Sequence, residues 1–179
     1  MKKILSLVII VLIMCGCNNN TARSAVERYL KKYKTLDSEV LVNMEEIIGR
    51  EDLNSENKEL YRTILKKQYK DLNYEILEEE YDDEVSYVTV KIKVYDYYKA
   101  NRDASIHLSN HPDDFNDEFG NYDVSKYNSY RLNNMKDVLD KVEYTIIFTV
   151  TKNDNKYEVM QPTENDLMKL HGIYNYDVD

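Results

Sequence analysis

The chain has 179 residues, and its 33 carboxylates against 24 basic residues give a formal net charge of −9. A surface this acidic repels phosphate groups, so we expect neither nucleic acid nor anionic lipid headgroups as partners. Four glycines are too few for a glycine-rich phosphate loop, and both cysteines lie within the first 17 residues. The length is that of a single domain, in which we expect no disulfide.

The first seventeen residues have the layout of a secretory signal. Lys2 and Lys3 precede an apolar run from Ile4 to Met14, which only Ser6 interrupts. This run is too short to cross a membrane, since a spanning helix needs about 20 apolar residues. Small residues follow it, as they do at a signal cleavage site. The segment therefore predicts export from the cytoplasm.

The end of this segment, Met14-Cys15-Gly16-Cys17, resembles the lipobox of bacterial lipoproteins, in which an apolar residue and two small ones precede a cysteine. The resemblance implies cleavage after Gly16 and a lipid on Cys17, which would hold the protein on the extracytoplasmic face of the cell membrane. We expect residues 1–16 to be the signal, 17–23 the lipidated cysteine and a short tether, and 24–179 one folded domain. A plain secreted protein and a one-pass anchor are the alternatives.

Three helices are predicted next, because apolar residues recur at intervals of three and four. The first runs from about Thr21 to Leu36, with Ser24 and Glu27 as a possible capping box. The second is capped by Ser38 and ends at Gly49, and the third starts near Ser55. These segments supply the helical layer of the predicted domain.

A period of two replaces the helical period after residue 72, which predicts strands. Asn73–Tyr81 and Val85–Tyr95 form a first pair, and Val142–Thr151 and Lys156–Met160 form a second. Along Val85–Tyr95 aliphatic residues alternate with tyrosine, threonine and lysine, so one face is expected to be buried and the other open. The order of elements predicts an α+β domain, an antiparallel sheet of about four strands packed on one face by helices.

Two more helices are predicted between the strand pairs, and a short one follows the second pair. Asp96 caps the first of them and Pro112 ends it, while the other runs from about Ser125 to Asp140. An acidic loop joins the two. The last helix begins near Thr163 and ends at Gly172.

Residues 24–174 are similar to small uncharacterised lipoproteins of low-GC Gram-positive bacteria. The similarity lies in the Ala-Val-Glu-Arg-Tyr-Leu run of the first helix, in Val85–Tyr98, in the run Tyr144–Val159 and in His171-Gly172-Ile173-Tyr174. Several such lipoproteins resemble the nuclear transport factor two-like (cystatin-like) fold, in which helices pack into a curved sheet. The resemblance implies a cone-shaped domain but transfers no catalytic residue, because that fold carries many functions.

Two segments are candidate metal sites. Asp103, His107 and His111 lie at intervals of four, which places them on one helix face in an arrangement that Zn²⁺ could use. A solvated helix face is the alternative. The loop Asp113–Asp123 is rich in the oxygen ligands that Ca²⁺ prefers, although its acidic residues lack the EF-hand spacing around Gly120. A metal- or calcium-binding lipoprotein is therefore the alternative function.

Tyr87, Tyr95 and Tyr97 form the remaining candidate site, a tyrosine face on the open side of the sheet. Tyrosine can stack on a sugar ring or a peptide, because its ring is apolar and its tip polar. The alternative is that a helix covers these rings. Since the mature chain has no nucleophile motif, we expect no enzyme and no cofactor. The function predicted is a membrane-anchored binding or interaction module for an unknown protein, peptide or glycan.

Overall fold

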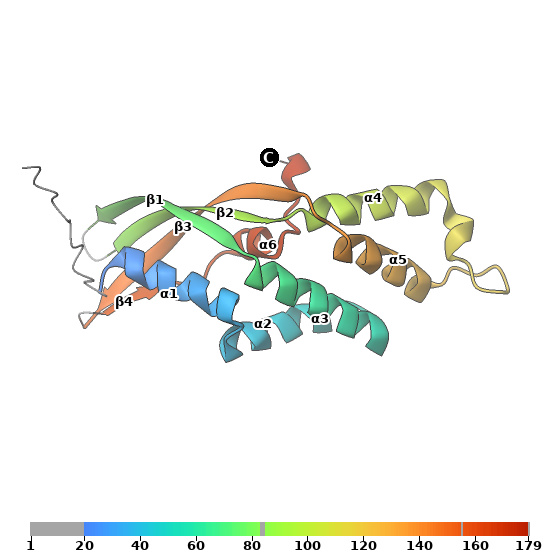
Figure 1. Cartoon of the computed structure of the whole chain (residues 1–179), viewed down its shortest axis with the longest axis horizontal. Helices are drawn as coiled ribbons and strands as arrows, with labels where there is room; N and C mark the ends of the chain where they lie inside the picture. Colours follow the sequence, from blue (N-terminus) through green and yellow to red (C-terminus); the bar gives the residue numbers. More distant parts are fainter. Residues whose placement is uncertain (1–19, 83–84, 155, 179) are drawn as a thin grey trace, which may run out of the picture.

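The computed structural model describes residues 20–82, 85–154 and 156–178. In this part the chain forms a four-stranded antiparallel sheet and six α-helices (Figure 1), which confirms the predicted α+β class. Cys17 and the signal segment lie outside the described residues. Across the described ranges, no helix combines the length and the apolar character needed to cross a membrane.

The helices are α1 (Ala22–Thr35), α2 (Ser38–Gly49), α3 (Ser55–Lys70), α4 (Tyr97–Asn110), α5 (Val124–Lys136) and α6 (Glu164–His171). The strands are β1 (Asn73–Asp82), β2 (Val85–Tyr95), β3 (Lys141–Asn153) and β4 (Lys156–Val159), and their order across the sheet is the order along the chain. Two 3₁₀ turns, η1 (Pro112–Phe115) and η2 (Tyr176–Val178), complete the elements.

The first helix begins earlier than its predicted capping box. Thr21 is the N-cap, with extended backbone, and it forms a reciprocal capping box with Ser24. The pairing of Ser24 with Glu27 is wrong, because Ser24 already lies at the third helical position. Residues 21–23, expected in the tether, therefore belong to the folded domain. The second cap is also one residue earlier than predicted, at Asp37 rather than Ser38.

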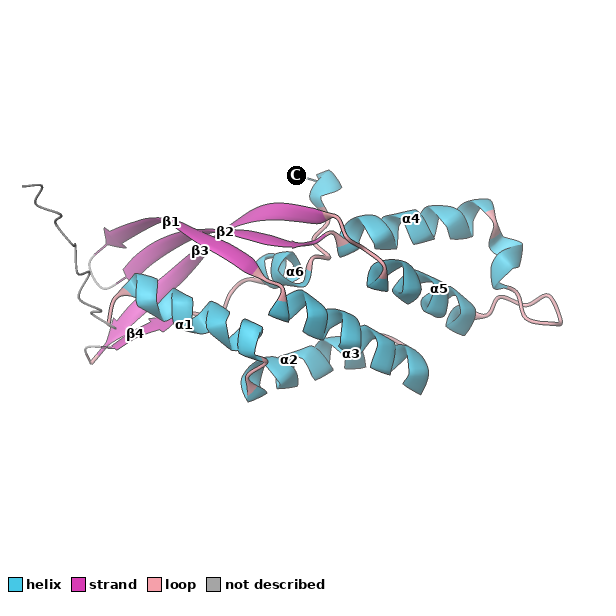
Figure 2. Cartoon of the chain, in the orientation of Figure 1, coloured by secondary structure: helices cyan, strands magenta, loops and turns pink. Residues whose placement is uncertain are grey.

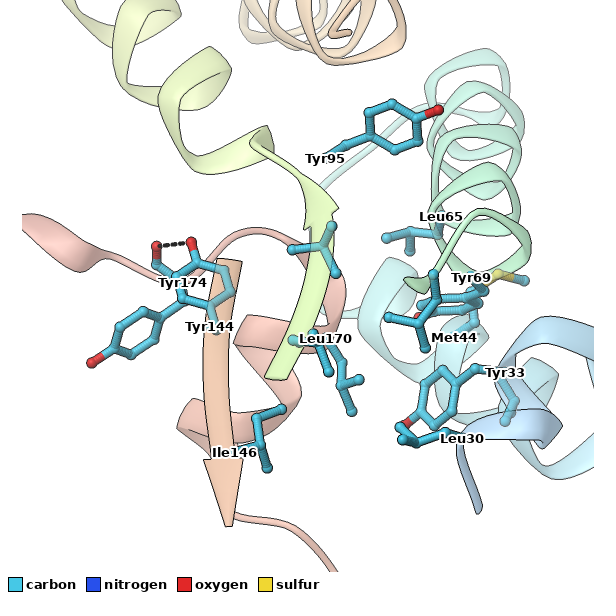
Figure 3. Packing of buried hydrophobic residues seen from close by; sticks show 14 of the residues in the cluster. Leu30, Tyr33, Met44, Leu65, Tyr69, Tyr95, Tyr144, Ile146, Leu170 and Tyr174 are labelled. Atoms are coloured by element: carbon cyan, nitrogen blue, oxygen red, sulfur yellow. Dashed lines mark hydrogen bonds between the residues drawn. The ribbon is translucent and has the colours of Figure 1, made fainter. Parts of the chain in front are cut away.

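One face of the sheet forms the core, as the alternation in β2 predicts. Val88, Val90, Ile92 and Val94 are each at most 1% exposed, and α1 and α6 pack against them. The register places Ile146 of β3 beside Val90, so aliphatic residues of neighbouring strands meet on the same side. Figure 3 shows Ile146 on its strand and Leu170 of α6 between the sheet and the residues of α1 and α3.

The helices α4 and α5 pack on each other beyond the end of the sheet, and together with residues 111–123 they form an arm (Figure 2). The base of the arm rests on α3, which packs on α5. The prediction that α5 reaches Asp140 is wrong, since it ends at Lys136. Residues 137–140 instead return the chain to β3, and Asp140 accepts a hydrogen bond from the amide of Asp96 at 3.1 Å.

Candidate functional site

The predicted tyrosine face is not formed. Tyr87 is 38% exposed on the open side of the sheet, but Tyr95 is 9% exposed and Tyr97 only 1%. The last two rings stack on each other, with centroids 5.9 Å apart, where the end of β2 meets α3 and α4. A ligand could reach one of the three expected tyrosines, so the three do not make a binding surface.

Tyr95 and Tyr97 are instead held by the helix that covers them. The Tyr95 hydroxyl donates to Asp71 at 2.8 Å, and the ammonium of Lys67 lies 3.3 Å from the centre of its ring. The Tyr97 hydroxyl donates to the carbonyl oxygen of Ile64 at 3.3 Å. Both polar tips are therefore satisfied within the protein, and the rings serve the core.

The three residues of the candidate zinc site do not converge. Asp103 lies near Lys99, at 3.9 Å, and near Arg102, at 3.7 Å. The Nε2 atom of His107 lies 2.9 Å from a carboxylate oxygen of Asp114, and the centroid of its ring lies 4.8 Å from that of His111. No group of three metal-ligating side chains is found in the part of the chain that the structure describes. The predicted combination of Asp103 with both histidines is thus not supported by the geometry.

In the acidic loop, the carboxylate of Asp117 is hydrogen-bonded to backbone amides of the loop itself. One oxygen of Asp117 accepts from the amides of Phe119 and Asn121, both at 2.8 Å. These hydrogen bonds lower the pKa of the Asp117 carboxyl. Phe115, within this loop, is 3% exposed and packs edge-to-face on Tyr127. The loop is ordered by these contacts, and its carboxylates are not gathered around a common point.

A groove that the sequence did not reveal opens among α1, α2, α3, β4 and α6. It consists of two adjoining cavities. The outer cavity, of about 520 Å³, is lined among others by Arg28, Tyr29, Lys32, Glu39, Tyr157 and Pro162. The inner cavity, of about 320 Å³, is lined among others by Ile47, Tyr61, Tyr69, Met168, His171 and Ile173. Both cavities share Tyr33, Val40, Asn43, Gln161 and Leu167.

Aromatic side chains run through this groove from one cavity to the other. The hydroxyls of Tyr29 and Tyr33 lie 3.3 Å apart, and Tyr33 packs edge-to-face on Tyr69 with ring centroids 5.2 Å apart. Figure 3 shows Tyr33 and Tyr69 near each other on the helical side of the core. Burial raises the pKa of both Tyr33 and Tyr69, so these phenols keep their protons and remain hydrogen-bonding groups.

His171, the last residue of α6, contributes an imidazole to the inner cavity. Its side chain is 5% exposed, and its Nδ1 lies 3.0 Å from the Tyr69 hydroxyl. Burial lowers the pKa of His171 to about 4, because the charged form would lose its hydration. The ring is therefore neutral at physiological pH, and it can donate through one nitrogen and accept through the other.

Charged residues lie at the mouth of the outer cavity. Lys32 of α1 and Glu39 of α2 form an ion pair of 2.6 Å, and this hydrogen bond raises the pKa of Lys32. Both side chains are substantially exposed, so the pair contributes little to stability. The pair links α1 to α2 beside the outer cavity.

The groove combines aromatic and aliphatic side chains with many polar ones, and a concave site with both kinds of group can hold a small ligand. A comparison of the chain with known protein families, with curated proteins and with solved structures finds no match.

Proposed function

We propose that this chain is a membrane-anchored extracytoplasmic lipoprotein whose folded domain is a non-enzymatic binding module. The proposal places the ligand in the groove rather than on the outer face of the sheet. The observation that carries it is the pair of adjoining cavities, of about 520 and 320 Å³, whose lining combines tyrosine rings and aliphatic side chains with amide and charged groups. Such side chains give a ligand both apolar contact and oriented hydrogen bonds.

The position of α1 is compatible with an anchor on Cys17. The start of α1 lies at the end of the molecule opposite the tip of the arm (Figure 1). A tether of three or four residues reaches at most about 14 Å, so a lipid on Cys17 would keep the sheet end near the membrane. The arm would then point away from the membrane, and the groove would lie between the two ends.

The anchor is tested by Cys17→Ser in the native cell. We expect this variant to lose labelling by a radioactive or clickable fatty acid and to appear in the medium, because the thioether cannot form and no other lipid attachment is proposed. Cys15→Ser is the matched control and should stay labelled and membrane-bound. Fatty-acid uptake by the Cys17→Ser protein would contradict the anchor.

The groove is tested by Asn43→Trp. Asn43 is exposed and lines both cavities, so an indole there narrows the groove at little cost to folding. We expect at least one fraction of an organic extract of the native cells to raise the melting temperature of the detergent-solubilised wild-type protein. A ligand at ten times its dissociation constant adds about 1.4 kcal/mol, which is about 3 °C for a domain of this size.

The Asn43→Trp protein should shift by less than about 1 °C with the same fraction. Val42→Trp provides the control, since Val42 is 59% exposed on the same helix and lines neither cavity. The proposed function is contradicted if no fraction stabilises the wild-type protein, or if Asn43→Trp responds as strongly as the wild type does.

A further inference from the structure

The inner cavity has a lining that differs from that of the outer one. Ile47, Leu167, Met168 and Ile173 supply aliphatic walls, and the rings of Tyr61 and Tyr69 supply aromatic ones. Its volume, about 320 Å³, is about twice that of an engineered cavity that holds benzene. A molecule with the size of two fused aromatic rings would therefore fill it.

One polar atom in this cavity has a free hydrogen-bonding position. The Nδ1 atom of His171 is bonded to the Tyr69 hydroxyl, and this is the one side-chain hydrogen bond found for His171 among the residues that the structure describes. Its Nε2 is not among the fully buried atoms that lack a partner in this part of the chain, so it is accessible from the cavity. A polar group of a ligand in the cavity can take the place of water as the hydrogen-bond partner of this atom. The side chain is 5% exposed, so bulk water has little access to it.

The charges around the inner cavity disfavour an ionic ligand. The lining includes three carboxylates, those of Glu46, Glu51 and Glu164, and one cation, Arg50, so it repels an anion. Glu51 is moreover bonded to Arg131 of α5, which leaves it less able to pair with a cation. The neutral imidazole and the phenols in the interior offer dipoles and no positive charge, so a ligand carboxylate would be buried there without compensation.

We propose that the inner cavity binds an uncharged small molecule with an apolar body of about two rings and one hydroxyl or amide group bonded to Nε2 of His171. The inference rests on the proposed function and names the ligand class of the same groove. The apolar body would lie among Ile47, Met168 and Ile173. The polar group would complete a chain of hydrogen bonds from the ligand through His171 to Tyr69.

Three probes of one shape test the ligand class: 2-naphthol, naphthalene and 2-naphthoate. Titration of the full protein in detergent, followed by the NMR signals of Ile47, Met168 and the His171 ring, should rank 2-naphthol first. We expect it to bind at least tenfold more tightly than 2-naphthoate, because the carboxylate would be buried beside other carboxylates. Naphthalene should lie about three- to tenfold below 2-naphthol, the range expected for one hydrogen bond.

His171→Phe separates the hydrogen bond from the cavity. The variant should bind 2-naphthol no more tightly than naphthalene, while its affinity for naphthalene stays within about threefold of wild type. Ile47→Trp, which fills the inner cavity from α2, should abolish binding of both probes, and Val42→Trp should leave both unchanged. If His171→Phe does not fold, the ranking of the three probes by the wild-type protein decides the question alone.

The inference is overturned if 2-naphthoate binds as tightly as 2-naphthol, if Ile47→Trp does not weaken binding, or if none of the three probes binds. These outcomes leave the proposed function standing as long as an extract fraction stabilises the wild-type protein and not the Asn43→Trp protein. The probe titration can therefore contradict the ligand class while the extract experiment still supports the proposed function.

Discussion

Replacement of Tyr97 by alanine should lower the free energy of unfolding by about 3–5 kcal/mol, the range for deletion of a buried aromatic ring. The ring is 1% exposed, stacks on Tyr95 and reaches the carbonyl oxygen of Ile64 on α3. Its removal would leave a cavity at the junction of the sheet, α3 and the arm. Urea unfolding followed by circular dichroism measures the loss.

Two other variants bracket this result. Tyr97→Phe removes only the hydrogen bond to Ile64 and should cost about 0.5–1.5 kcal/mol. Tyr87→Ala should cost less than about 1 kcal/mol, because Tyr87 is 38% exposed on the open face of the sheet. A Tyr97→Ala protein as stable as Tyr87→Ala would show that the ring is not part of the core.

The periodicity of the chain was sufficient to locate most elements. The expected strand Val85–Tyr95 has the same bounds in the structure, because its alternation is unbroken and a turn precedes it. Asp96 also caps α4 as predicted, by accepting from the amide of Lys99 at 3.0 Å. Local signals of this kind depend only on residues within one turn or one strand, so the sequence contains them in full.

The tyrosine face was mispredicted because the alternation along a strand does not show which part of its open face other elements bury. Tyr87 and Tyr95 occupy the same side of β2 by alternation, yet only Tyr95, at the end of the strand, meets residues at the end of α3. Lys67 and Asp71 at the end of α3 bind that ring, and nothing in the alternation of β2 reveals their approach. Burial on that side depends on tertiary packing, which overrides the local pattern.

The groove was missed for a related reason. Tyr29 and Tyr33, four residues apart on α1, fit the apolar stripe of a core helix equally well, and Tyr69 fits that of α3. Their partner His171 is 102 residues further along than Tyr69, and only the docking of α6 brings the two rings together. The one available signal was the large number of tyrosines, 17 in the whole chain, several of which lie on predicted helices.

Gly172 holds that docking in place, and Gly172→Ala is expected to be the second strongly destabilising change. The residue ends α6 with φ +73°, a left-handed conformation that costs alanine about 1–2 kcal/mol. A Cβ there would also overlap the carbonyl oxygen of Tyr95 and the side-chain amide of Gln68. Relieving that overlap should cost a further 1–3 kcal/mol or so, as overpacking of a core does.

Gly120→Ala separates the two contributions, because Gly120 has φ +82° in the arm loop and open space where its Cβ would lie. We expect it to lose about 1–2 kcal/mol and Gly172→Ala about 2–5 kcal/mol in the same urea experiment. The Tyr95 carbonyl has little freedom to move away, since the amide of Tyr95 is bonded to Gln68 at 2.9 Å and the amide of Tyr98 to the Gly172 carbonyl at 2.8 Å.

A shift of α6 away from β2 is therefore the easiest relief, and it would carry His171 out of reach of Tyr69. Gly172→Ala should then weaken 2-naphthol binding at least tenfold under conditions in which most of the protein is still folded, whereas Gly120→Ala should leave that affinity unchanged. Equal losses of stability in the two glycine variants would mean that α6 is not held against the sheet as tightly as the structure indicates.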